Sequence, residues 1–122
     1  MTTHTTPAFR VTAEAWKGLP AMTEHAGDGY IGDVYENPEG SAMCSGFFEL
    51  HHTEEPLVYL YEYDEMKVVL EGELLLENVD TGQRGIARAK DAVFFPSGSR
   101  IAFSTPSHAL AFYTGHRDAT LL

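Results

Sequence analysis

The sequence predicts an all-β fold, and three observations lead to this expectation. Short segments rich in β-branched and aromatic residues alternate with turn residues along most of the chain. Beyond residue 20, no stretch has the apolar spacing of a long amphipathic helix. The segments are short and closely spaced, as is typical of β-sandwiches and β-barrels.

The N-terminal part is expected to be a polar tail followed by a short helix or arm. Residues 1–8 are mostly polar and are predicted to form a flexible tail. In residues 12–17, Thr12 could cap one or two helical turns, which Gly18 and Pro20 would end.

About eight or nine strands are expected after this segment, separated by turn signals. A turn is predicted at residues 37–40, and the sequence Asp-Thr-Gly at residues 80–82 predicts a tight hairpin. The polar run at residues 51–56 is interpreted as a loop. The predicted strands are residues 30–36, 42–50, 57–63, 66–70, 73–79, 83–89, 92–95, 101–104 and 109–114.

Composition is that of one small domain with an acidic surface. The 122 residues are enough to bury a core, and we expect a single domain over residues 1–122. The formal net charge of -10 argues against nucleic acids and anionic membranes as partners. Cys44, the one cysteine, suits a reducing compartment. No apolar run approaches the ~20 residues of a membrane span, so the protein is expected to be cytoplasmic.

Two spaced motifs carry a family resemblance. Glu65 and Gly72 form a Glu-x6-Gly motif, and Asp91, Pro96 and Gly98 form an Asp-x4-Pro-x-Gly motif. In this order and separation the motifs resemble those of the cupin superfamily. The resemblance implies a jelly-roll barrel of two sheets, a fold that hosts many chemistries.

A narrower likeness is to the ethanolamine-utilisation Q-type cupins. The matching segments are Tyr-Asp-Glu at 63–65, Val-Leu-Glu-Gly at 69–72, Phe-Pro-Ser-Gly-Ser at 95–99 and Phe-Ser-Thr-Pro at 103–106. The likeness covers roughly residues 42–116, which are therefore the expected barrel core. That subfamily resembles other cupins in fold but lacks their histidine triad.

The resemblance also implies that the usual metal site is absent. Tyr59, Tyr61 and Ile101 stand where three histidines hold the metal in other cupins. Neither isoleucine nor neutral tyrosine replaces imidazole as a strong ligand, so no metal or other cofactor is expected.

An atypical metal site is the alternative. It would combine Glu49 and either His51 or His52 with Glu65, although adjacent histidines in a strand point to opposite faces. His25, His108 and His116 are expected to be surface or hydrogen-bonded residues; these three are not assigned to a site.

By analogy, four polar side chains are expected to point into the barrel. Tyr59 and Tyr61 take inward positions, and Glu65 and Lys67, two residues apart, share the inner face of the next strand. Glu65 or Lys67 is predicted to be the general base or acid, with the tyrosines orienting the substrate or donating a proton. The rival interpretation is a buried ion pair among core aromatic residues.

The remaining pocket wall is expected to be mainly apolar. The predicted substrate-binding residues are Glu49, His51, Phe47, Phe95, Ile101, Phe103 and Tyr113.

These residues predict an enzyme that isomerises, dehydrates or cyclises a small organic molecule without metal. A homodimer is expected, in which the N-terminal arm covers a partner's sheet edge. A non-catalytic ligand-binding or accessory cupin of a metabolic cluster is the first alternative. Acetate kinase activity, associated with the Q-type family, is another. The chain has no Gly-x4-Gly-Lys-Ser/Thr loop, and its local basic group is Arg84, Arg88, Lys90 and Arg100.

Overall fold

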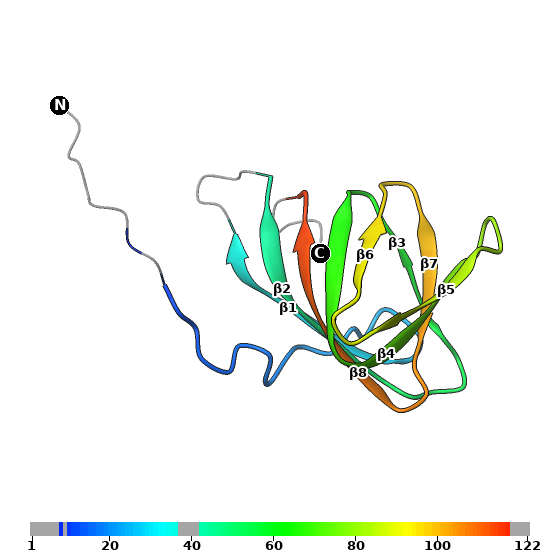
Figure 1. Cartoon of the computed structure of the whole chain (residues 1–122), viewed down its shortest axis with the longest axis horizontal. Helices are drawn as coiled ribbons and strands as arrows, with labels where there is room; N and C mark the ends of the chain where they lie inside the picture. Colours follow the sequence, from blue (N-terminus) through cyan, green and yellow to red (C-terminus); the bar gives the residue numbers. More distant parts are fainter. Residues whose placement is uncertain (1–7, 9, 37–41, 118–122) are drawn as a thin grey trace.

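The computed structural model describes residue 8 and residues 10–36 and 42–117, which form eight β-strands (Figure 1). Apart from Ala8, the predicted tail lies outside the described residues, as does the predicted turn at 37–40. The strands are β1 Asp28–Glu36, β2 Cys44–His51, β3 Leu57–Leu60, β4 Glu65–Asn78, β5 Arg84–Arg88, β6 Ala92–Phe95, β7 Arg100–Ser104 and β8 His108–Gly115. The predicted all-β fold is confirmed.

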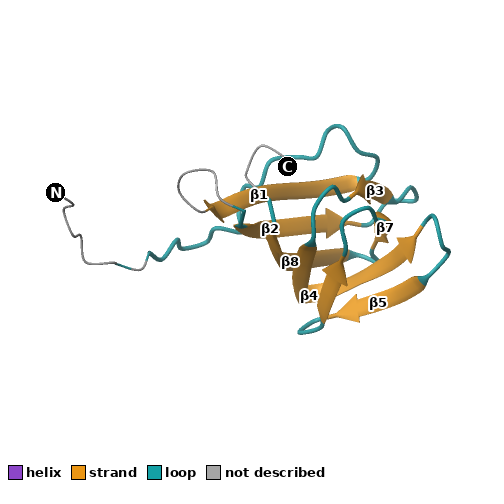
Figure 2. Ribbon diagram, turned by 90° about the horizontal axis from the view of Figure 1, so that it is seen from above, coloured by secondary structure: helices purple, strands orange, loops and turns teal. Residues whose placement is uncertain are grey.

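All the strand pairs are antiparallel, and together they form a curled sheet with two layers. The hydrogen-bonded order is β1-β2-β8-β4-β7-β3, and β5 and β6 each pair with β4. The first half of β4 pairs with β8 and β6, and its second half pairs with β5 and β7. Strand β4 therefore passes from one layer into the other, and the layers curl around a shared interior (Figures 1 and 2).

The sequence predicted two strands where the structure has the single strand β4. The bend lies at a register shift between Val69 and Glu71, followed by Gly72 at a φ of 71°. Gly72 still pairs with Ala109 of β8, so the glycine bends the strand without ending it. A Cβ on Gly72 would overlap the carbonyl oxygen of His108. The glycine of the Glu-x6-Gly motif is thus required by the crossing of two backbones.

The predicted helix at residues 12–17 is wrong, and this segment belongs to an arm. Residues 13–18 form turns, with Glu14 and Gly18 at positive φ. A run this short gains too few helical hydrogen bonds to offset nucleation. The Thr12 hydroxyl, instead of capping a helix, lies 2.7 Å from the Tyr35 hydroxyl.

In the described part of the chain, no helix meets the length and hydrophobicity needed to cross a membrane.

The arm is attached to the barrel through β1. Ala21 forms an isolated bridge with Tyr30, and the Ile31 amide donates to the Pro20 carbonyl at 2.9 Å. Residues 19–25 therefore lie beside β1. Further toward the N-terminus, Arg10 and Thr12 contact the Tyr35 hydroxyl near the far end of β1. The described part of the arm thus follows this edge strand (Figure 2).

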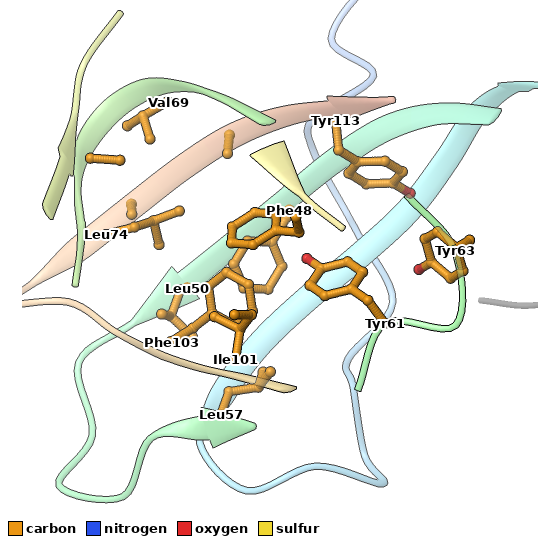
Figure 3. Packing of buried hydrophobic residues seen from close by; sticks show 14 residues of the cluster. Phe48, Leu50, Leu57, Tyr61, Tyr63, Val69, Leu74, Ile101, Phe103 and Tyr113 are labelled. Atoms are coloured by element: carbon orange, nitrogen blue, oxygen red, sulfur yellow. The ribbon is translucent and has the colours of Figure 1, made fainter. Parts of the chain in front are cut away.

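Alternation along the strands fills the interior with apolar side chains. In β2, Phe48 and Leu50 are buried, while Phe47 and Glu49 between and before them are only partly buried. Side chains from both layers meet around Phe103, and the phenols of Tyr61, Tyr63 and Tyr113 lie at one end of this core (Figure 3). These buried hydroxyl groups therefore gather at one mouth of the barrel.

Gly72→Ala is expected to destabilise the fold by more than about 3 kcal/mol, because strain at positive φ adds to a backbone overlap. Gly82→Ala is the matched control. Gly82 has a φ of 79° but has no atom within 4 Å of an added Cβ. It should therefore lose only about 1–2 kcal/mol. Urea unfolding measures both, and equal losses would contradict the role given to the overlap.

Candidate functional site

Three tyrosines enter the barrel mouth at alternating positions. Tyr59 lies near the end of β3, and Tyr61 and Tyr63 follow in the connection to β4. The Tyr61 amide donates to the Ser99 carbonyl at 2.9 Å, and the Gly98 amide donates to the Tyr61 carbonyl at 2.7 Å. The turn of the Asp-x4-Pro-x-Gly motif therefore fixes the backbone that carries the central tyrosine.

Glu65 is the centre of a buried polar network. The Tyr61 hydroxyl donates to Glu65 Oε2 at 2.6 Å, and Lys67 Nζ lies 2.8 Å from the same oxygen. The side chains of Glu65 and Lys67 are only 1% and 2% exposed. Both residues are on the inner face of β4, as their spacing predicted. A pair this deeply buried has to satisfy its charges internally.

The Lys67 ammonium lies within a cage of aromatic rings. Its Nζ is 4.8 Å from the ring centroid of Phe48, 4.9 Å from that of Tyr113 and 5.8 Å from that of Phe103. Attraction between a cation and ring faces strengthens as water is removed. The rings therefore support the charge that Glu65 balances on the other side.

Burial keeps the three phenols protonated. Burial and the neighbouring Glu65 carboxylate raise the pKa of Tyr61 well above its usual value. Burial also raises the pKa of Tyr59 and Tyr63, whose hydroxyls lie 2.7 Å apart. Near neutral pH these groups act as hydrogen-bond donors, a state suited to stabilising an oxyanion.

A second, partly buried network, around Asp33 and Arg117, was not predicted from the sequence. Arg117 makes a bidentate contact with the Asp33 carboxylate at 2.9 and 3.0 Å, and the Tyr113 hydroxyl donates to the same carboxylate at 2.6 Å. The guanidinium also lies 5.1 Å from the Tyr63 ring centroid. Burial opposes its charge, but hydrogen bonds to Asp33 and Tyr63 outweigh this and hold the pKa of Arg117 above its usual value.

The interior space beside Glu65 is too small for a substrate. The cavity bounded by Tyr61, Glu65, Lys67 and neighbouring rings has a volume of about 10 Å³. That is close to the minimum for one water molecule. The expectation of a substrate cavity within the barrel is therefore wrong for this conformation, because aromatic side chains fill the space.

A larger cleft lies outside this cavity, between the arm and β1. Its volume is about 590 Å³, within the range of small-molecule sites. Its lining includes His25 and Asp33, and it reaches Tyr59. Met22, Ile31 and Tyr59 line both the cleft and the small cavity. These three side chains form a partition that separates the 590 Å³ cleft from the small cavity beside Glu65.

Four of the predicted substrate-binding residues lie in the core. Phe95 stacks on Tyr61 with ring centroids 5.0 Å apart, and Phe103 borders the small cavity. Ile101 and Tyr113 are buried in the same cluster. They support the polar network rather than forming an open pocket wall.

Phe47, Glu49 and His51 do not face the barrel interior, where the pocket was expected. Phe48 and Leu50 of β2 face the core, so the three residues that alternate with them lie on the outer face. Phe47 packs on Phe112 there, with ring centroids 5.6 Å apart.

The atypical metal site with Glu65 is also contradicted by this geometry. Glu49 and His51 lie on the outer face of the sheet, and Glu65 lies on the inner face. Nδ1 of His52 is instead 2.8 Å from the Thr105 carbonyl oxygen.

Comparisons with known proteins connect these features to a family. A family model described as ethanolamine utilisation protein EutQ matches residues 21–118. The chain is 37% identical over 81 residues to acetate kinase EutQ of Salmonella typhimurium LT2, covering 66% of this chain and 34% of that protein. The chain thus spans about a third of the length of that relative.

Solved structures agree with this match. The crystal structure of ethanolamine utilization protein Q from Salmonella typhimurium LT2 has a TM-score of 0.66 and 32% identity, covering 75% of this chain and 71% of the other. The cupin domain of Cnp3 from Schizosaccharomyces pombe has a TM-score of 0.61 at 12% identity, covering 76% and 67% of the two chains. The latter likeness shows the fold alone, and the predicted cupin jelly roll is confirmed.

Lys67→Met is expected to lower the free energy of unfolding by about 3–5 kcal/mol, since it leaves a buried carboxylate without its cation. The double variant Glu65→Gln/Lys67→Met should recover much of this loss. Lys17→Met is the matched control. The Lys17–Glu14 pair has the same 2.8 Å separation, but its side chains are 53% and 67% exposed. It should change stability by less than about 1 kcal/mol. Denaturant titration measures all three, and equal effects in the two single variants would contradict a buried charge pair.

The raised pKa values of the buried phenols predict a loss of stability in alkali. The unfolded phenols ionise near pH ~10, whereas the folded protein holds their protons to higher pH. The buried phenols therefore make their full contribution to the free energy of unfolding below pH ~10, and this contribution is lost as the pH rises above that value. Tyrosinate absorbance of Tyr59, Tyr61, Tyr63 and Tyr113 should appear together with unfolding. Smooth ionisation of all six tyrosines in a protein that keeps its circular dichroism would contradict this.

Proposed function

The chain belongs to the EutQ family, and from this premise we propose that it is a small-molecule enzyme with acid–base chemistry at the mouth of its cupin barrel. The reaction would be the isomerisation, dehydration or cyclisation of a small organic substrate. One observation carries the proposal: Tyr59 lines both the 590 Å³ cleft and the small cavity beside Glu65.

The cleft has the composition of a small-molecule site. Leu19, Pro20 and Met22 supply apolar surface, and His25 and Asp33 are polar groups on the same lining. Such a combination holds an organic molecule through its apolar part and orients it through a few hydrogen bonds. The substrate would therefore bind between the arm and β1.

The phenols would act on charge that develops in the substrate. Tyr59 and Tyr63 are joined by a hydrogen bond and stay protonated, so Tyr59 can donate to an enolate or alkoxide oxygen in the cleft. Donors fixed in advance stabilise an oxyanion without reorganising during the reaction.

Glu65 would supply the base once the partition opens. Of the three side chains that separate Glu65 from the cleft, Met22 is unbranched and can change rotamer at low cost. Glu65 is held on one oxygen by Tyr61 and Lys67, so either neighbour can stabilise its charge before proton transfer and return a proton afterwards.

Acetate kinase activity is a second candidate, because the relatives carry that name. Phosphoryl transfer needs cations that stabilise the charge of the phosphates. In the described part of the chain near the cleft, Lys17 pairs with Glu14, Lys67 with Glu65 and Arg117 with Asp33. This pairing leaves the kinase hypothesis weaker than the acid–base one.

The function is tested by assaying a panel of small hydroxy, keto and amino compounds by NMR. For a converted substrate, Tyr59→Phe and Glu65→Gln should each lower kcat/KM at least tenfold, about 1.4 kcal/mol of transition-state stabilisation. Tyr30→Phe, on the outer face of β1, is the matched control and should keep full activity. Circular dichroism verifies that each variant is folded.

Other outcomes separate the alternatives. Formation of ADP from acetate, ATP and Mg²⁺ by the wild type would favour the kinase. Saturable binding without turnover would favour a ligand-binding cupin. Full activity in both site variants would show that Tyr59 and Glu65 are part of the scaffold.

A further inference from the structure

The outer face of the barrel holds a cluster of metal-binding side chains. We propose that Glu49, His51 and His108 bind a divalent transition-metal ion, with zinc as the expected occupant. One potential ligand atom from each residue lies within 4.8 Å of the other two. The site lies on the opposite face of the sheet from Glu65 and is independent of the proposed acid–base reaction.

The distances are close to those of a coordination sphere. Nε2 of His108 is 3.0 Å from Glu49 Oε2, and Nε2 of His51 is 3.8 Å from Glu49 Oε1. Ligand bonds of about 2.0–2.2 Å in a tetrahedral zinc site place neighbouring ligand atoms about 3.4 Å apart. Small side-chain rotations would therefore bring all three atoms to bonding distance from one ion.

The sheet register holds the ligands together. Glu49 and His51 are two residues apart in β2, so they share its outer face. His51 is the register partner of His108 in β8, and their ring centroids are 5.1 Å apart. Strands β2 and β8 lie side by side in the middle of this layer (Figure 2). The ligands are thus on rigid strands rather than on loops.

The surroundings favour a cation. Asp28 of β1 is the register partner of His51 on its other side, so a second carboxylate borders the cluster. The Tyr30 hydroxyl donates to Asp28 at 2.6 Å and positions that carboxylate. The formal net charge of -10 adds a general attraction for cations.

The donor set selects the class of metal. Two imidazole nitrogens and one carboxylate oxygen suit zinc and its first-row neighbours, whereas calcium and magnesium prefer oxygen ligands throughout. Three protein ligands leave at least one position open. The side chains of Glu49, His51 and His108 are 26%, 41% and 35% exposed. Water or a small anion can therefore reach a bound ion.

The proposal is tested by titrating chelator-treated, untagged protein with ZnCl2 in a calorimeter, and with CoCl2 by visible absorption. The wild type should bind one ion per chain. His51→Ala, His108→Ala and Glu49→Gln should each weaken binding at least tenfold. His116→Ala, an exposed histidine outside the cluster, is the control and should bind as the wild type does.

Thermal unfolding gives an independent readout. Zinc should raise the Tm of the wild type and of His116→Ala, but not that of the three cluster variants. A ligand raises the Tm when it binds the folded protein in preference to the unfolded chain, and zinc can do so only where the site is intact. Absence of zinc binding by the wild type would overturn the proposal. It would equally be overturned if the cluster variants bound zinc as tightly as the control.

Discussion

The buried contact between Glu65 and Lys67 is the constraint on which the barrel mouth depends. Two opposite charges at 2.8 Å, both almost free of solvent, are tolerated only because their surroundings satisfy them. Tyr61 supplies the hydrogen bond to the carboxylate, and aromatic rings surround the ammonium. Aromatic residues suit the core positions around this ion pair. A phenol can donate a hydrogen bond to the carboxylate and ring faces attract the ammonium, whereas aliphatic side chains do neither.

The same constraint gives the motif glutamate of the cupin frame a set of partners within the protein. Tyr61 and Lys67 contact Glu65, and Tyr61 stands where the resemblance to other cupins places a histidine. The turn at Gly98 and Ser99 still fixes the backbone of Tyr61. The motifs therefore preserve geometry, whereas the chemistry depends on which side chains that geometry presents.

Much of the fold follows from local patterns in the sequence, and the site follows only in part. Alternation correctly placed Glu65 and Lys67 on one face, since a strand has a period of two. The rule also correctly gives Glu49 and His51 a common face, but it does not say which face, and both were expected on the pocket side. Phe47 and Phe48 are adjacent apolar residues, so the sequence leaves open which of them faces the core. The contact of Asp33 with Arg117 joins residues 84 positions apart, and no local pattern reports such a pairing. The one sequence feature that pointed to this contact was Asp33, a charged residue at an inward position of β1 that needs a partner when buried.

Strand β4 has a consequence for how the protein opens. Its two halves form ladders with four different strands, and its backbone is common to both layers. The two layers also bury their side chains against one another in a common core. We therefore expect unfolding of the barrel to be cooperative across the layers. The arm forms its backbone hydrogen bonds with the edge strand β1, while Met22 packs against the core and His25 against the Tyr59 ring. Because fewer strand hydrogen bonds hold the arm than hold β4, we expect the entrance beside the arm to open at a lower free-energy cost than the barrel as a whole.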